Sequence, residues 1–152
     1  MKPALVLTPL FILYIGLVFI KPAGADTTSI LHVNIEIIKA HNDSSVVDPK
    51  LKGLVKELGS VLNFSGFSLI KKRKISLQVN DKTSLMLSTG QQLELQLLEF
   101  VDDKARLSVR ILKQKEETFK TILVFIDNGS ALIGGPPHGG GTLLLRIRAK
   151  FR

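Results

Sequence analysis

From residue 67 to the end of the chain, short segments of alternating apolar and polar residues follow one another, separated by turns of a few residues. Alternation with a period of two is typical of half-buried strands, and it is clearest in residues 92–97 and 106–111. A parallel strand pair needs a crossover of about a dozen residues or more, so such short connections favour antiparallel neighbours. The pattern therefore predicts a mainly antiparallel β-sheet or a sandwich, with one face of the sheet exposed to water.

The turns between these segments contain residues that accept turn conformations, and Asn128-Gly129 is a strong hairpin signal. Residues 122–126 are apolar without alternation, which predicts a central strand covered on both faces. The predicted strands span residues 30–38, 67–70, 74–79, 84–87, 92–100, 106–112, 119–126, 131–133 and 142–151.

One amphipathic helix is predicted between the first two strands. Asp48-Pro49 is typical of a helix start, with Asp as the N-cap and Pro at the first helical position. Apolar residues then recur at helical spacing up to Leu62, and we expect this face to lie on the sheet. The fold class expected from these patterns is α+β.

The first 25 residues have the layout of a secretory signal peptide. Lys2 stands in a short basic head, an apolar run covers residues 4–20, and Ala23-Gly24-Ala25 follows as a site with small side chains. The same apolar run is just long enough for an uncleaved membrane anchor, so both alternatives stay open. We expect a periplasmic or secreted protein, which is attached to a membrane only if the leader is retained.

Residues 26–152 are expected to form a single domain. Without the leader the chain loses only Lys2 and Lys21 from its 21 basic residues, which leaves 19 basic against 13 acidic side chains. A chain of this length buries an adequate core without covalent crosslinks. The sequence contains no cysteine, which excludes disulfides, a lipoprotein anchor, thiolate metal sites and a cysteine nucleophile.

The densest charge cluster gives the candidate anion-binding residues. Four adjacent cations raise the local electrostatic potential enough to attract an anionic polymer or lipid headgroups. A solvated turn, or an edge segment that discourages aggregation, is the interpretation that we favour. No aromatic residues interleave with the cations, and together with export this argues against nucleic acid. The cluster consists of Lys71, Lys72, Arg73 and Lys74.

A glycine- and proline-rich stretch gives the candidate partner-binding residues. It lacks the Gly-Lys-Ser/Thr ending and the following helix of a phosphate-binding loop, so it reads as a hairpin loop whose tip is available to a protein partner. Its residues are Gly134, Gly135, Pro136, Pro137, His138, Gly139, Gly140 and Gly141.

No catalytic, metal or cofactor site is expected. His32, His41 and His138 are far apart and lack metal-ligand spacing, and the paired carboxylates of residues 102–103 and 116–117 are adjacent residues in predicted turns. No combination of nucleophile, base and orienting group can be assembled, which predicts a protein that is not an enzyme.

The segment from Leu93 to Ile147 resembles the terminal β-region of secretins, the outer-membrane ring proteins of secretion and pilus systems. The matching residues are the turn Asp127-Asn128-Gly129-Ser130 and the strand that ends in Gly134-Gly135. The chain has no room for a ring-forming domain, so pore formation is not implied. The resemblance implies a β-rich envelope component that is accessory to secretion or pilus assembly.

Two functional hypotheses follow. The first is a non-enzymatic module that binds another envelope protein through a sheet edge or through residues 134–141. The second is an electrostatic binder of anionic envelope polymers or lipid headgroups through residues 71–74.

Overall fold

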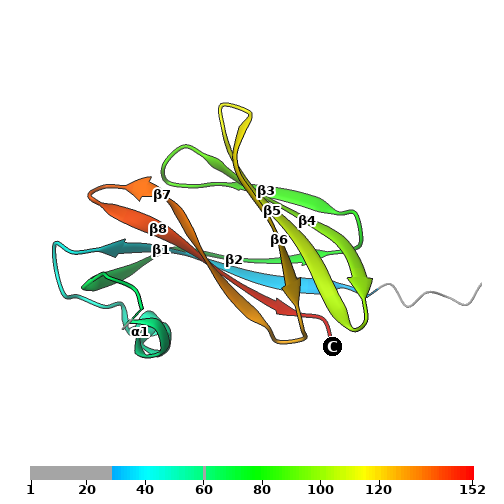
Figure 1. Ribbon diagram of the computed structural model, residues 1–152, viewed down its shortest axis with the longest axis horizontal. Coiled ribbons are helices and arrows are strands. Elements are labelled where there is room, and N and C mark those ends of the chain that lie inside the picture. The colour runs from blue at the N-terminus through cyan, green and yellow to red at the C-terminus, as the bar shows by residue number, and fades with distance from the viewer. Residues whose placement is uncertain (1–28, 60) are drawn as a thin grey trace, which may run out of the picture.

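The computed structural model describes residues 29–59 and 61–152. The leader expected over residues 1–25 lies outside the described residues. Eight strands form two four-stranded antiparallel sheets, here called sheet A and sheet B (Figure 1). Sheet A has the order β2-β1-β8-β7 and contains β1 (Leu31–His41), β2 (Gly66–Leu77), β7 (Ser130–His138) and β8 (Gly141–Lys150). Sheet B has the order β3-β4-β5-β6 and contains β3 (Lys82–Met86), β4 (Gln92–Val101), β5 (Lys104–Lys113) and β6 (Glu116–Phe125).

The strand order follows the chain around the molecule. Within each sheet, strands that are consecutive in sequence pair with each other, and β8 returns to pair with β1. This circle is open at two places, between β2 and β3 and between β6 and β7, where the chain passes from one sheet to the other. The described part is therefore a flattened up-and-down arrangement of strands with two seams.

The main hydrophobic core lies between the two sheets. Alternate residues of each strand point inward, as the pleat of a strand requires. On β1 these are Leu31, Val33, Ile35 and Ile37, and on β5 they are Ala105, Leu107, Val109 and Ile111, all of which are buried. The inner faces of the two sheets thus interdigitate in the manner of a β-sandwich.

A second, smaller core lies on the outer side of sheet A. A 3₁₀ helix, Pro49–Leu51, leads into α1, Lys52–Leu58, and the Asp48 side chain caps the start by accepting a hydrogen bond of 2.9 Å from the Lys50 backbone N–H. Figure 1 shows α1 beneath one end of sheet A. Its buried residues pack against Ile38, Ala40, Phe67 and Leu144 of the sheet.

The expectation of a β-rich domain with mainly antiparallel strands and one short helix is confirmed. The predicted helix start at Asp48-Pro49 is also confirmed, although α1 ends at Leu58 and Val61 is exposed. Within residues 29–59 and 61–152, no helix has the length and apolar character needed to cross a membrane.

The prediction of two strands around residues 71–74 is wrong. β2 continues from Gly66 to Leu77, and its register against β1 shifts between Leu69 and Lys71. Ile70 is the extra residue of this bulge, and a bulge reverses which residues face which side of the sheet. Phe67 and Leu69 therefore face α1, whereas Lys71 and Arg73 face the opposite side. The reversal hides the continuous alternation that a single strand normally shows.

The prediction of a central strand at residues 122–126 is also wrong. β6 is the edge strand of sheet B, and Ile122 and Val124 point outward, with 44% and 58% of their surface exposed. Phe125 points inward and is buried. Because the outward-facing residues of this strand are also apolar, its sequence shows no alternation, although only one face of the strand contacts the core.

Candidate anion-binding face

The outer face of sheet A carries three rows of polar side chains that run across β2, β1 and β8. Alternation brings every second residue of each strand to this face, and the antiparallel register sets them opposite one another. The rows are Lys72-Glu36-Arg146, Lys74-Asn34-Arg148 and Ser76-His32-Lys150. We call these nine residues the basic face.

Glu36 is the centre of the first row and holds its cations in place. It is 6% exposed, and its carboxylate lies 2.9 Å from the Arg148 guanidinium, 3.2 Å from Lys72 Nζ and 3.6 Å from the Arg146 guanidinium. A carboxylate buried to this extent needs ionic and hydrogen-bonding partners, and here it has three cations. The arrangement fixes three flexible cationic side chains in one orientation before any ligand arrives.

The other two rows border a groove of about 680 Å³. His32 and Asn34 lie along its middle, Lys74 and Ser76 lie on the β2 side, and Arg148 and Lys150 lie on the β8 side. His32 Nδ1 and Ser76 Oγ are 2.9 Å apart. Asn128, in the turn between β6 and β7, closes one end. The groove thus places uncharged hydrogen-bonding groups between two lines of cations.

Several buried polar atoms of the basic face have no hydrogen-bond partner among the described residues. They are Asn34 Oδ1, Arg146 Nε, Arg148 Nε and Glu36 Oε2. Buried polar groups are hydrogen-bonded in the great majority of folded proteins, so these atoms need partners from water or from a ligand. Two of the four are guanidinium donors, which prefer anionic oxygen atoms as partners.

The basic face carries a clear excess of positive charge. It has five cations and a single carboxylate, so its formal excess is four charges. Asp127 lies at the end near Lys150, but its carboxylate is occupied by the backbone N–H groups of Phe151 and Arg152, at 2.8 and 3.2 Å. The hydrogen bond from Phe151 is the main cause of the lowered pKa of Asp127. Clustered uncompensated charge of one sign attracts oppositely charged ligands over several ångströms.

The structure divides the predicted cluster of residues 71–74 between two sides of β2. Lys72 and Lys74 belong to the basic face, whereas Lys71 and Arg73 point toward the seam between β2 and β3. β2 is an edge strand, so the segment is not a turn. The four cations therefore do not form one site, because neighbouring residues of a strand point in opposite directions.

Residues 134–141 are not a loop, contrary to the sequence-based interpretation. β7 continues to His138 and β8 begins at Gly141, which leaves only Gly139 and Gly140 as the turn. Both have positive φ, at 51° and 75°, as a two-residue hairpin turn of the mirror-image type requires. Pro136 and Pro137 are tolerated because β7 is an edge strand with a bulge at this place.

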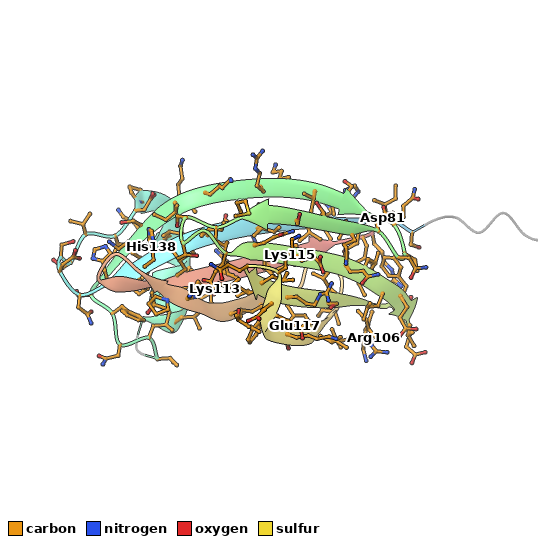
Figure 2. All side chains as sticks on the ribbon, turned by 90° about the horizontal axis from the view of Figure 1, so that it is seen from above. Asp81, Arg106, Lys113, Lys115, Glu117 and His138 are labelled. Carbon is orange, nitrogen blue, oxygen red and sulfur yellow. The ribbon has the colours of Figure 1, made fainter. Side chains whose placement is uncertain are left out.

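The two sets of predicted site residues lie apart. Gly141 and Lys150 are at opposite ends of β8, so the glycine-rich hairpin is remote from the groove. Figure 2 shows His138 at the opposite end of the molecule from Asp81 and Arg106. His41 is buried beside Asp43, and His32 lies in the groove. In the described part of the chain, no three His, Asp or Glu side chains gather in an arrangement that suits a metal ion.

The sequence interpretation missed most of the basic face. It singled out Lys72 and Lys74 but not the cations of β8, Arg146, Arg148 and Lys150, or their buried partner Glu36. A signal was present, because Arg146, Arg148 and Lys150 alternate with apolar residues and must share one face of a strand.

The chain matches no known protein family, no curated protein and no solved structure. The resemblance of residues 93–147 to secretins stays a prediction. The charge and geometry of the basic face are therefore the basis for a functional proposal.

Proposed function

We propose that the protein is a non-enzymatic, exported binding module that holds an anionic polymer of the cell envelope on its basic face. The observation that supports this most directly is the gathering of five cations from two strands on one face beside a groove, with the buried carboxylate of Glu36 as their single acidic neighbour and direct partner of three of them. Such a face supplies cations and hydrogen bonds for phosphate, sulfate or carboxylate groups.

Two features favour a polymer over an isolated anion. The cations lie on two lines, Lys72 and Lys74 on β2 and Arg146, Arg148 and Lys150 on β8, with β1 between them. Neighbouring strands are about 4.8 Å apart, so the two lines are roughly 10 Å apart, and cations along one strand repeat at about 7 Å. Charges with this repeat suit an extended ligand that carries several anionic groups.

The uncharged groups favour a ligand that also makes neutral hydrogen bonds. Asn34, His32 and Ser76 lie between the cations and are suited to hydroxyl groups. A sugar polymer with anionic substituents offers both kinds of group, whereas a lipid surface presents its headgroups in a plane. We therefore favour an anionic polysaccharide over a membrane as the ligand.

The test compares two pairs of substitutions that remove the same charge. Arg148→Gln with Lys150→Gln removes two of the three cations that line the groove. Lys113→Gln with Lys115→Gln removes two exposed cations at the β5–β6 hairpin (Figure 2). Binding to heparin and to lipopolysaccharide is measured by titration at several salt concentrations. We expect roughly tenfold weaker binding for the groove pair and little change for the hairpin pair.

Salt dependence gives a second readout, because exposed charges are screened within about 10 Å at 0.1 M salt. The groove pair is expected to reduce the salt dependence of binding as well as the affinity. Equal effects of the two pairs would show that only total charge matters, and this would overturn the proposal. Binding to anionic vesicles that exceeds binding to both polysaccharides would assign the face to a membrane instead.

A further inference from the structure

A second charged hollow lies at the seam between β2 and β3, on the other side of β2 from the basic face. It has a volume of about 430 Å³. Its β2 wall includes Lys71, Arg73 and Ile75, and its β3 wall includes Leu85 and Met86. Neither Lys71 nor Arg73 has a role in the anion-binding face proposed above.

The two strands that border this seam are both sheet edges. Within residues 29–59 and 61–152, β2 pairs along its length only with β1, and β3 pairs only with β4. Figure 1 shows the two strands in different sheets. The backbone N–H and C=O groups on the outer edge of a strand can pair with a further strand.

The chain itself already adds a short segment to the edge of β2. Val47 forms a parallel bridge with Phe67, in which the Phe67 N–H donates to the Val46 carbonyl at 3.0 Å and the Asp48 N–H donates to the Phe67 carbonyl at 2.8 Å. This contact ends before the bulge at Ile70. The residues of β2 from Lys71 onward therefore lie on the same strand edge that pairs with Val47 at Phe67.

The side chains of the seam determine which strand fits. Lys71 and Arg73 supply two cations on the same side of β2, and Ile75, Leu85 and Met86 supply apolar surface, with Met86 55% exposed. An added strand presents alternate side chains to each side. Carboxylates opposite the two cations make cross-strand ion pairs, and apolar residues on the same strand cover the exposed apolar surface.

We infer that the seam between β2 and β3 is a docking site for an extended acidic segment of a partner protein, which adds to the edge of β2 at residues 71–75. A charged polysaccharide has no peptide N–H and C=O groups to pair with the strand edge, and its sugars do not cover the apolar wall. Of the four adjacent cations, Lys72 thus faces the polymer, Lys71 and Arg73 face the peptide, and Lys74 borders both sites.

The probe is an acetylated, amidated ten-residue peptide that carries a fluorophore. It has Thr at every second position, and the positions between are Glu followed by Val, so that Glu can lie opposite Lys71 and Arg73 and Val opposite Ile75. Its binding to the full protein is followed by fluorescence anisotropy at low salt, and amide hydrogen exchange reports where it docks. We expect slower exchange at residues 71–75. A peptide of the same sequence with alternate backbone nitrogens methylated keeps its charge but loses the donors needed for strand pairing, and we expect it not to bind.

Two neighbouring substitutions provide the matched comparison. Arg73→Gln and Lys72→Gln each remove one positive charge from adjacent residues of β2, but only Arg73 lines the seam. We expect roughly fivefold weaker peptide binding for Arg73→Gln and an unchanged affinity for Lys72→Gln.

Three outcomes would overturn the inference: equal binding of the methylated peptide, equal effects of the two substitutions, or slower exchange that avoids residues 71–75. Heparin binding by the Arg73→Gln variant is measured in parallel and is expected to stay unchanged. A peptide that fails to bind while heparin binding persists rejects the docking site alone, so the two proposals fail independently.

Discussion

The outer faces of the two sheets are built by the same alternation, but their charges are arranged differently. On sheet B, Glu94 is paired with Arg110 and lies 3.2 Å from Lys82 Nζ. Arg110 also lies 3.4 Å from Glu117. A separate pair joins Glu99 to Arg106. On sheet A a single carboxylate, Glu36, serves three cations. On sheet B three cations thus meet three carboxylates, with Lys104 and Lys120 as further cations, whereas the basic face of sheet A has one carboxylate for five cations. The net charge of the chain does not reveal this difference.

The two faces also differ in what covers them. One half of the outer face of sheet A lies under α1 and forms a second core, whereas the outer face of sheet B includes an exposed apolar edge at Ile122 and Val124. Outward-facing apolar residues thus stabilise the fold only where another element covers them.

The largest effect is expected from loss of the helix contact. Leu54 is 4% exposed in the core beneath α1, so Leu54→Ala is expected to lower the free energy of unfolding by about 2–4 kcal/mol. Val124→Ala, at a residue that is 58% exposed on sheet B, is expected to change it by less than about 0.5 kcal/mol. Urea unfolding followed by circular dichroism measures both. Similar losses would show that α1 does not form a true second core.

An intermediate effect is expected when the central carboxylate of sheet A is neutralised. Glu36→Gln leaves Lys72, Arg146 and Arg148 without their shared partner, and we expect a loss of about 1–3 kcal/mol in the free energy of unfolding at low salt.

Inorganic phosphate is expected to restore part of this loss, because an added anion replaces the missing charge among the three cations. Glu94→Gln on sheet B is the matched control: Arg110 keeps Glu117 as a partner, so phosphate is expected to help this variant no more than the unmodified protein. Equal recovery in both variants, measured by thermal unfolding with and without phosphate, would contradict a special role for the basic face.

The smallest effect concerns acid stability. Burial raises the pKa of Glu94, but hydrogen bonds and charges from Arg110 and Lys82 outweigh it and leave the pKa below its ordinary value. A carboxyl group with a lowered pKa in the folded state stabilises the protein above its unfolded-state pKa, and this contribution disappears as the pH falls through the folded-state pKa. Stability is therefore expected to fall as the pH drops below about 4.5, the ordinary pKa of this carboxyl group.

Glu94→Gln removes one of the groups that cause this fall, so its stability is expected to depend less steeply on pH over the same range. Urea midpoints at several pH values measure the slope. An unchanged slope would assign the acid sensitivity to other carboxylates, of which Asp127 is the first candidate because its pKa is also lowered.

Local patterns in the sequence predicted most of the strands and the start of the helix, because alternation and capping depend on neighbouring residues. The prediction failed where a single residue changes the phase, as Ile70 does in β2, and where the position of a strand in its sheet matters, as for β6. It also treated the glycines and prolines of residues 134–138 as a loop, whereas an edge strand accommodates them.

The candidate site was harder to predict than the fold. Lys72 and Lys74 were recognised because they are adjacent to other cations in the sequence, but Glu36 and Arg148, whose side chains are hydrogen-bonded at 2.9 Å, are 112 residues apart. Only the pairing of β1 with β8 brings them together, and no local pattern specifies which distant strands become neighbours.

The pairing of β1 with β8 also bears on when this domain can fold. β1 is the first strand of the described chain and β8 the last, yet both occupy the centre of sheet A. Contacts of such long sequence separation form slowly, since the intervening chain must be ordered first. Until β8 is available, β1 has a neighbour on one side only, so the domain cannot close its core while its last strand is still being made. This strand order postpones closure of the core until β8 has been made.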